Sequence, residues 1–213
     1  DEAARLRRAG IRAPILLYAA GLPETAGEVI ALGLTPTISD LAEARAYSAA
    51  ASTAHEVFVK VDVGLYRAGV VAEAAVRFIA EVARLPRLRV GGVYSHLYAP
   101  NPEGDPAYPA WQFARFTRVL EGLAAEGIEV PVRMVASTPI VLRFPEMSLN
   151  AVDPGRLIYG ITHPLRASQP VDLRPALRAI KSRIILRRAV SEAWSRRPRG
   201  VTREGLYRLS PVR

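Results

Sequence analysis

Apolar and polar positions along this chain follow two periods, one typical of helices and one typical of buried strands. Amphipathic runs at residues 1–9, 23–33 and 39–51 are each followed by a short apolar stretch. The first two runs end at glycine, the usual residue just past a helix, and the second begins with proline, which favours a first turn. Ser39 is the expected cap of the third run. The pattern predicts helices that alternate with strands.

Two further helices are predicted from apolar residues that recur every three or four positions. The earlier one has a single buried face made of Val71, Ala75, Phe78, Val82 and Leu85. The later one has an apolar side, made of Phe113, Phe116, Leu120 and Leu123, and stops at Gly127. The strand candidates lie at residues 14–18, 34–38, 56–63, 89–96, 131–137 and 150–159.

The alternation of strands and helices indicates βαβ units in a parallel sheet, either doubly wound or part of a (β/α)8 barrel. Residues 56–63 favour the barrel. Their odd positions are all valine, whereas their even positions are Glu, Phe, Lys and Asp. Strands of a doubly wound sheet are usually apolar on both faces, whereas charges on one face fit the interior and mouth of a barrel. We therefore predict an α/β fold, a partial (β/α)8 TIM-type barrel that holds strands 3–8.

The pattern changes after a cluster of prolines at positions 164, 170 and 175. Residues 177–186 look like a lone strand of a different unit, and the stretch beyond them is rich in Pro and Arg without apolar periodicity. We therefore place the barrel at residues 1–168. Residues 169–213 are predicted to be the start of a β-rich second domain with an Arg-rich tail.

The net charge of +9 changes this picture little, because most of it lies in the tail. Residues 187–213 contain eight arginines and two glutamates, and only two residues in the whole chain are lysines. An Arg-rich tail without interleaved aromatic residues is a weak sign of nucleic-acid binding, so we expect no nucleic-acid partner. The sequence contains no apolar run of about 18 residues, so no membrane span is predicted. The absence of cysteine excludes disulfides and thiolate sites, and we expect a cytoplasmic protein.

Four segments with chemically useful side chains fall where barrel strands should end. They are KVDVGLYRAG at residues 60–69, YSH at 94–96, ASTP at 136–139 and VDPGRLIYG at 152–160. Active residues gather at strand carboxyl ends in this fold, and glycine beside a hydroxyl loop suits a phosphate cradle. Each segment alone also has a structural interpretation. His96 could be a hydrogen-bonded histidine of the core, and Ser137 and Thr138 could cap the helix that follows them. Lys60 and Asp62 could form a structural ion pair in the barrel interior.

In this order and spacing, the four segments resemble the N-terminal barrel domain of alanine racemases. The similarity covers residues 1 to about 186, and the family shows KxDxGMxRxG-like, G-x-Y-[ST]-H, small-residue Ser and R-P-G-x-x-L-Y-G segments. The resemblance implies an isomerase of fold type III that uses pyridoxal 5'-phosphate to interconvert L- and D-alanine for D-alanine biosynthesis. It also implies a homodimer.

The resemblance assigns a role to each matching residue. Arg67 would donate to the phenolic oxygen of the cofactor, and His96 would lie beneath the pyridine ring. Ser137 and the backbone N–H groups of Gly155 and Arg156 would bind the phosphate. Lys60 matches a lysine that is carbamylated in many members and orients the arginine. Leu65 stands where Met is usual and would lie near the substrate.

Three departures from the family pattern limit what the resemblance implies, and the first two concern the catalytic lysine and tyrosine. The family carries its Schiff-base lysine on the first barrel strand, in a K-A-x-A-Y-G segment, and takes its catalytic tyrosine from the partner's second domain. The sequence has no K-A-x-A-Y-G segment, and neither Lys60 nor Lys181 matches that lysine. We therefore expect an incomplete barrel that begins at the second helix. Alone, it should be inactive, and it should aggregate or stay partly unfolded because its sheet edges are open.

The third departure is Asp153, which occupies the position of the family's Arg opposite the pyridine nitrogen. A carboxylate there would favour the protonated ring and a stronger electron sink. The alternative is that Asp153 pairs with Arg156 or another neighbour. Three functions remain open: an alanine racemase, a related racemase or lyase for another amino acid, and a non-catalytic fragment that binds phosphate or the cofactor weakly.

Overall fold

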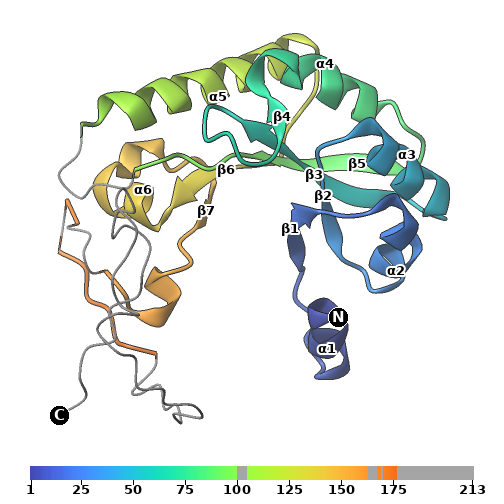
Figure 1. The fold of residues 1–213 in the computed structure, drawn as a ribbon, viewed down its shortest axis with the longest axis horizontal. Helices are drawn as coiled ribbons and strands as arrows, with labels where there is room; N and C mark the ends of the chain where they lie inside the picture. Colours follow the sequence, from blue (N-terminus) through green and yellow to red (C-terminus); the bar gives the residue numbers. More distant parts are fainter. Residues whose placement is uncertain (100–104, 163–166, 169, 177–213) are drawn as a thin grey trace, which may run out of the picture. The chain divides into compact units, whose positions relative to one another are not determined.

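The computed structural model describes residues 1–99, 105–162, 167–168 and 170–176 (Figure 1). Six strands form one parallel sheet in the order β1-β2-β3-β5-β6-β7, and the short β4 pairs with β3. These strands are β1 (Leu16–Ala20), β2 (Thr35–Ile38), β3 (His55–Asp62), β4 (Val70–Val71), β5 (Leu88–Tyr94), β6 (Val132–Ser137) and β7 (Ala151–Asp153). The predicted α/β fold with a partial barrel sheet is confirmed.

Helical segments occupy the connections between these strands. They are α1 (Glu2–Arg8), η1 (Pro23–Thr25), α2 (Ala26–Ala31), α3 (Leu41–Ala50), α4 (Ala72–Ala83), α5 (Ala107–Ala125), α6 (Thr138–Arg143), η2 (Pro145–Met147) and η3 (Leu157–Tyr159). In Figure 1, α4 and α5 lie next to each other along the same side of the sheet. No helix in the described ranges is long and apolar enough to cross a membrane.

The two faces of β3 carry different side chains, as the alternation of its sequence predicts. Val57, Val59 and Val61 are completely buried in the main apolar core, which they share with residues of the helices. Phe58 points to the other face, where it packs with Tyr94 of β5 and Met134 of β6. The sheet therefore separates a large helix-side core from a smaller cluster on the barrel-interior side, and this second face leads to the site described below.

Three predicted details of the elements are wrong. Residues 150–159 are not one strand: β7 ends at Asp153 because Pro154 has no N–H for the ladder, and η3 follows. The cap of α3 is Asp40, whose carboxylate accepts from the backbone N–H of Ala42, and not Ser39. Val71 precedes α4 and is exposed, while Ile79 is fully buried in its place.

The predicted second domain cannot be compared with the structure, because residues 177–213 lie outside the described residues. The barrel-like body itself extends to Ala176. Residues near the predicted boundary still bond to it. The backbone N–H of Ser168 donates to Leu142 O at 2.7 Å, and that of Ala176 donates to Tyr159 O at 3.2 Å. The boundary at residue 168 stays a prediction.

Candidate functional site

The four predicted segments come together at one end of the sheet. They follow the carboxyl ends of β3, β5, β6 and β7, which are consecutive neighbours in the strand order. Parallel strands end at the same edge, so residues far apart in sequence meet there. A cavity of about 460 Å³ opens at this edge, a volume within the usual range for small-molecule sites. Its lining residues are His96, Leu97, Tyr98, Ala99, Ser137, Thr138, Pro139, Asp153, Gly155 and Arg156.

Five of the eight predicted site residues line this cavity: His96, Ser137, Asp153, Gly155 and Arg156. The other three, Lys60, Leu65 and Arg67, belong to β3 and the loop after it and do not line it. Arg67 is exposed and Leu65 is half-buried. The structure therefore gathers the β5, β6 and β7 segments around one cavity and leaves the β3 loop beside it.

Ser137 is the residue whose environment most clearly indicates a ligand. It is the last residue of β6, only 6% of its surface is exposed, and its hydroxyl oxygen has no hydrogen-bond partner among the described residues. It occupies the cap position of α6 without making a side-chain cap bond, so the predicted alternative of a capping serine does not hold. A buried hydroxyl without a hydrogen-bond partner lowers the stability of the fold unless a ligand or a water molecule supplies that partner.

Gly155 and Arg156 also line the cavity. A Cβ atom placed on Gly155 would meet nothing within 4 Å, so the backbone here faces open space. The two amides are engaged within the protein: Gly155 N–H donates to Asp153 O at 2.8 Å, and Arg156 N–H donates to Thr138 Oγ1 at 3.1 Å. The two N–H groups of the predicted phosphate cradle thus point to internal acceptors, and the cradle stays a prediction.

Asp153 and His96 face each other across the cavity wall. The carboxylate oxygen Asp153 Oδ2 and the ring nitrogen His96 Nδ1 lie 3.9 Å apart, and both side chains are mostly covered. The other carboxylate oxygen, Asp153 Oδ1, is buried without a hydrogen-bond partner in the described part of the chain. The structure therefore gives Asp153 a histidine as a neighbour and leaves one acceptor oxygen open.

Asp62 organises the loop that carries Leu65 and Arg67. Its Oδ1 accepts the backbone N–H groups of Gly64, Leu65 and Tyr66 at 2.9, 2.8 and 3.2 Å. Among the described residues no ion pair joins Asp62 to Lys60, so Asp62 acts here as a loop cap. Such a cap fixes the three residues that lead into Arg67.

Lys60 lies on the barrel-interior face of β3, only 6% exposed. Its ammonium group is 5.5 Å from the ring centre of Tyr94, whose hydroxyl donates to Tyr18 O at 3.1 Å. Burial, and next the positive charge of Arg67, lower the pKa of Lys60, although Asp153 and Asp62 oppose the shift. Burial raises the pKa of both Tyr18 and Tyr94, with the charge of Asp153 adding to the effect. This face therefore lowers the pKa of its lysine and raises the pKa of its tyrosines.

Sequence reasoning missed several residues that shape this end of the sheet. Tyr98 lines the cavity, and Tyr18 meets Tyr94 edge-on at 5.3 Å. Tyrosine at a strand end carries no distinctive spacing, and only strand register brings these rings together. No cluster of His, Cys, Asp and Glu suited to a metal ion occurs in the part of the chain that the structure describes.

Comparison with known proteins assigns this geometry to a family. Residues 1–163 match the family model described as alanine racemase, N-terminal domain. The alanine racemase of Desulfovibrio desulfuricans is 38% identical over 189 residues, which cover 87% of this chain and 50% of that protein. That of Desulforamulus reducens is 36% identical, over 86% of this chain and 50% of that protein. The chain thus spans about half the length of the curated relatives it matches.

Solved structures give the same result. The alanine racemase of Clostridium difficile 630, in a complex with cycloserine, superposes with a TM-score of 0.76 at 26% identity, over 82% of this chain and 49% of that one. A histidine racemase from Leuconostoc mesenteroides also superposes, with a TM-score of 0.68 at 26% identity, over 82% of this chain and 48% of that one. From the sequence match and the shared fold, the chain belongs to the alanine racemase family, whose N-terminal domain it carries.

Proposed function

We propose that this chain supplies the pyridoxal-phosphate-binding face of an amino-acid racemase of the alanine racemase type. One observation carries the proposal: the unpartnered, buried hydroxyl of Ser137 belongs to a residue that lines a cavity of about 460 Å³, which the uncrowded backbone of Gly155 also lines. A phosphate group would give the Ser137 hydroxyl the hydrogen-bond partner that no described residue provides. Bound pyridoxal phosphate supplies an electron sink that makes the α-C–H bond of an amino acid acidic.

The residues around the cavity would bind and orient the cofactor. The hydroxyl of Ser137 would donate a hydrogen bond to a phosphate oxygen. The N–H groups of Gly155 and Arg156 would join it by exchanging their present acceptors, Asp153 O and Thr138 Oγ1, for phosphate. His96 would lie against the ring, and Arg67 would hold the phenolic oxygen as its anion by charge and hydrogen bonding.

Lys60 would support Arg67 and would not hold the cofactor. It is buried on the interior face and does not line the cavity. Its lowered pKa increases the fraction of neutral amine, which is the form that reacts with carbon dioxide to give a carbamate. A carbamate is anionic, so it would remove the repulsion between Lys60 and Arg67 and attract the guanidinium instead.

Alanine is the proposed substrate, because the alanine racemases above are similar over 86% or more of this chain. A second candidate is a racemase or lyase for another amino acid. Asp153 favours it, since its unpartnered Oδ1 atom would accept a hydrogen bond from a protonated pyridine nitrogen, which favours the protonated ring and the stronger electron sink. The similarity to a histidine racemase shows that this fold also serves a larger substrate.

We also propose that the chain alone binds the cofactor without a covalent bond and does not catalyse racemisation. Lys60 is the only lysine among the described residues, and Lys181 lies outside them. The missing groups, a cofactor lysine and a tyrosine base, would come from further polypeptide and from a partner in a homodimer. A cytoplasmic location stays a prediction.

A ligand comparison tests the proposal. The chain is titrated with pyridoxal phosphate and with pyridoxal, which lacks the phosphate, while absorbance is followed. We expect at least a tenfold preference, on the order of 1.4 kcal/mol, for the phosphorylated form, and displacement of the cofactor by inorganic phosphate. Equal affinity for the two ligands would contradict the proposal.

Borohydride reduction of the same samples, followed by mass spectrometry, tests the non-covalent part of the proposal. The expected result is an unchanged chain mass. A saturable adduct on Lys60 or Lys181, formed at the concentration that half-saturates binding, would overturn that part and leave the phosphate site standing.

A further inference from the structure

The amino-terminal half of α5 contacts both of the loops that flank the cavity. The hydroxyl of Tyr108 donates to the carbonyl oxygen of Gly64 at 2.6 Å, in the loop that follows β3. The side-chain oxygen of Gln112, one turn later, accepts the backbone N–H of Tyr98 at 2.7 Å, in the loop that follows β5. A helix that returns antiparallel to its strand begins near the strand carboxyl ends, so this half of α5 is well placed to hold both loops.

Aromatic packing reinforces these two hydrogen bonds. The ring of Tyr108 meets Tyr98 edge-on with centres 6.2 Å apart, and it stacks on Trp111 with centres 5.5 Å apart. Trp111 lies so close to Gly64 that an added Cβ atom would be 2.7 Å from the indole ring. Gly64 also has a φ of 120°, which L side chains rarely adopt. Only glycine fits beneath Trp111.

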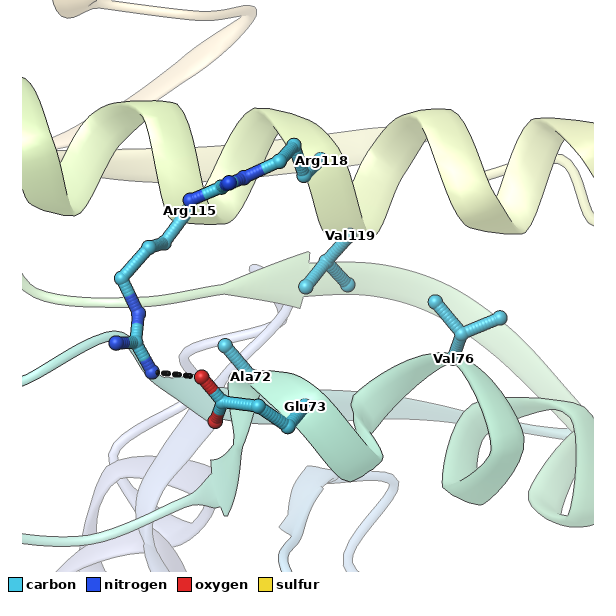
Figure 2. Close-up of a pocket in the computed structure, with 6 residues that line it drawn as sticks. All are labelled: Ala72, Glu73, Val76, Arg115, Arg118 and Val119. Carbon is cyan, nitrogen blue, oxygen red and sulfur yellow. Dashed lines mark hydrogen bonds and ion pairs between the residues drawn. The ribbon is translucent and has the colours of Figure 1, made fainter.

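Arg115 extends the same row and ties it to the neighbouring helix. Its guanidinium lies 4.7 Å from the Trp111 ring, and its NH2 group donates to the carboxylate of Glu73 on α4 at 2.5 Å. Figure 2 shows this bond bridging α4 and α5 at one end of a groove of about 260 Å³. The helix that holds the two loops is therefore itself fixed against the rest of the barrel.

The two anchored loops carry the two groups proposed to contact the cofactor away from its phosphate. Gly64, held by Tyr108, lies three residues before Arg67, and the turn between them is capped by Asp62. Tyr98, held by Gln112, lies two residues after His96. Gln112 is completely buried, so its acceptor oxygen is directed by the core and not by solvent.

We propose that Tyr108 and Gln112 are positioning residues: together they form a clamp, with Trp111 between them, that sets the Arg67 loop and the His96 loop relative to each other. The inference rests on the proposed function, because the two loops matter only if Arg67 and His96 approach one cofactor. The clamp acts through the backbone at Gly64 and Tyr98, so its residues need not touch the ligand.

Amide hydrogen exchange tests the clamp without any ligand. Tyr108→Phe keeps the aromatic stack and removes one hydrogen bond, which should raise exchange of the Asp62-bonded amides of residues 64–66 about fivefold. Gln112→Met should raise exchange at Tyr98 by a similar factor. Arg118→Ala is the matched control, since Arg118 lines the groove in Figure 2 on the same helix and makes no hydrogen bond to residues 64–66 or to Tyr98. Unchanged exchange in both variants would overturn the clamp.

A spectroscopic measurement then links the clamp to Arg67. With pyridoxal phosphate bound, Tyr108→Phe should shift the pH midpoint of the phenol–phenolate absorbance change upward, because a loosened Arg67 favours the phenolate less. A lost fold would abolish binding and would not move this midpoint. An unchanged midpoint overturns the clamp, whereas failure of the unaltered chain to bind the cofactor overturns the proposed function while leaving the exchange result valid.

Discussion

Two serines at strand ends, 42 positions apart, show how single residues divide between folding and function. Ser95, just after β5, donates its hydroxyl to Val61 O at 2.6 Å and so joins two neighbouring strands. Ser137, at the end of β6, is equally buried but has no partner among the described residues. An unsatisfied buried hydroxyl opposes stability, and such groups persist where function needs them.

Substitution of the two serines should therefore have opposite effects on stability. Ser137→Ala removes a hydroxyl that the fold does not use, so the free energy of unfolding should stay within about 0.5 kcal/mol or rise. Ser95→Ala loses a buried hydrogen bond and should lower that free energy by about 1 kcal/mol. Urea unfolding followed by circular dichroism measures both. A larger loss for Ser137→Ala than for Ser95→Ala would contradict this account of the site.

Lys60 makes stability depend on pH in a defined direction. Its pKa is lowered by burial and by Arg67 from the ordinary value of 10.5, so the unfolded chain binds more protons between the lowered value and 10.5. The free energy of unfolding should therefore rise with pH across that window. Lys60→Met should remove the rise. The comparison stops near pH 10, because the raised pKa of Tyr94 makes stability fall above its ordinary value of 10.0. If the free energy of unfolding of the unaltered chain fell with pH below pH 10, the lowered pKa of Lys60 would be contradicted.

At this scale the sequence predicted residue types better than it predicted their partners. His96, Ser137, Asp153 and Gly155 could be found because each belongs to a short segment at a strand end, and the structure brings all four to one cavity. The engaged amide of Arg156 could not be foreseen, since its acceptor, Thr138 Oγ1, lies at the start of α6, 18 residues earlier in the chain. Tyr98 and Gln112 were missed because their contact depends on how α5 returns across the sheet.

Among the elements, the loop between β3 and β4 is the most tightly specified. Asp62 caps its first turn, and Gly69 closes it against the strand that precedes it. At Gly69 a Cβ atom would lie 2.9 Å from Lys60 O and 3.0 Å from Asp62 N, and the φ of 120° is unfavourable for any L side chain. The sequence pattern with glycine at both 64 and 69 thus encodes a loop held close to its own strand.

Gly69→Ala should be clearly more damaging than the same change at Gly10. Both glycines have positive φ, but an added Cβ at Gly10 meets nothing within 4 Å. We expect a loss of about 1 kcal/mol at Gly10 from the backbone conformation alone, and about 3 kcal/mol at Gly69, where contact with fixed backbone atoms adds to it. Thermal and urea unfolding of the two variants measure this difference. Equal losses of unfolding free energy in the two variants would contradict the close contact between an added Cβ at Gly69 and the backbone of β3.

The elements were predictable where the apolar period was long. The valines of β3 and the amphipathic α5 follow from spacing alone, and both were placed correctly. Residues 150–159 were wrong because an apolar run can hide a turn, here forced by Pro154 and the Gly155 N–H that bonds back to Asp153 O. The two-residue β4 is too short to carry a period at all.

For the whole molecule, the decisive feature is the open sheet. The strand order begins at β1 and ends at β7, so within the described residues each of these has an edge without a partner strand. Tyr18 on β1 and Val152 on β7 are 44% and 42% exposed, which adds apolar surface at both edges. Unpaired edges of this kind are templates for pairing with another chain.

We therefore expect the chain, when expressed alone, to associate through these edges as its concentration rises. Sedimentation velocity over a range of protein concentrations should show species larger than the monomer that grow with concentration. A charged substitution at each edge, Tyr18→Lys with Val152→Lys, should reduce association if the edges are responsible. An unaltered chain that stays monomeric over the whole concentration range would contradict this expectation.

The central claim is that Ser137 marks a cofactor phosphate site in a member of the alanine racemase family. Its most direct test is the affinity for pyridoxal phosphate of Ser137→Ala, at protein concentrations low enough to keep the chain monomeric, with Ser95→Ala as the buried-serine control. We predict that Ser137→Ala weakens binding about tenfold without loss of stability, whereas Ser95→Ala lowers stability and leaves affinity unchanged. Equal affinity of Ser137→Ala and the unaltered chain would contradict the claim.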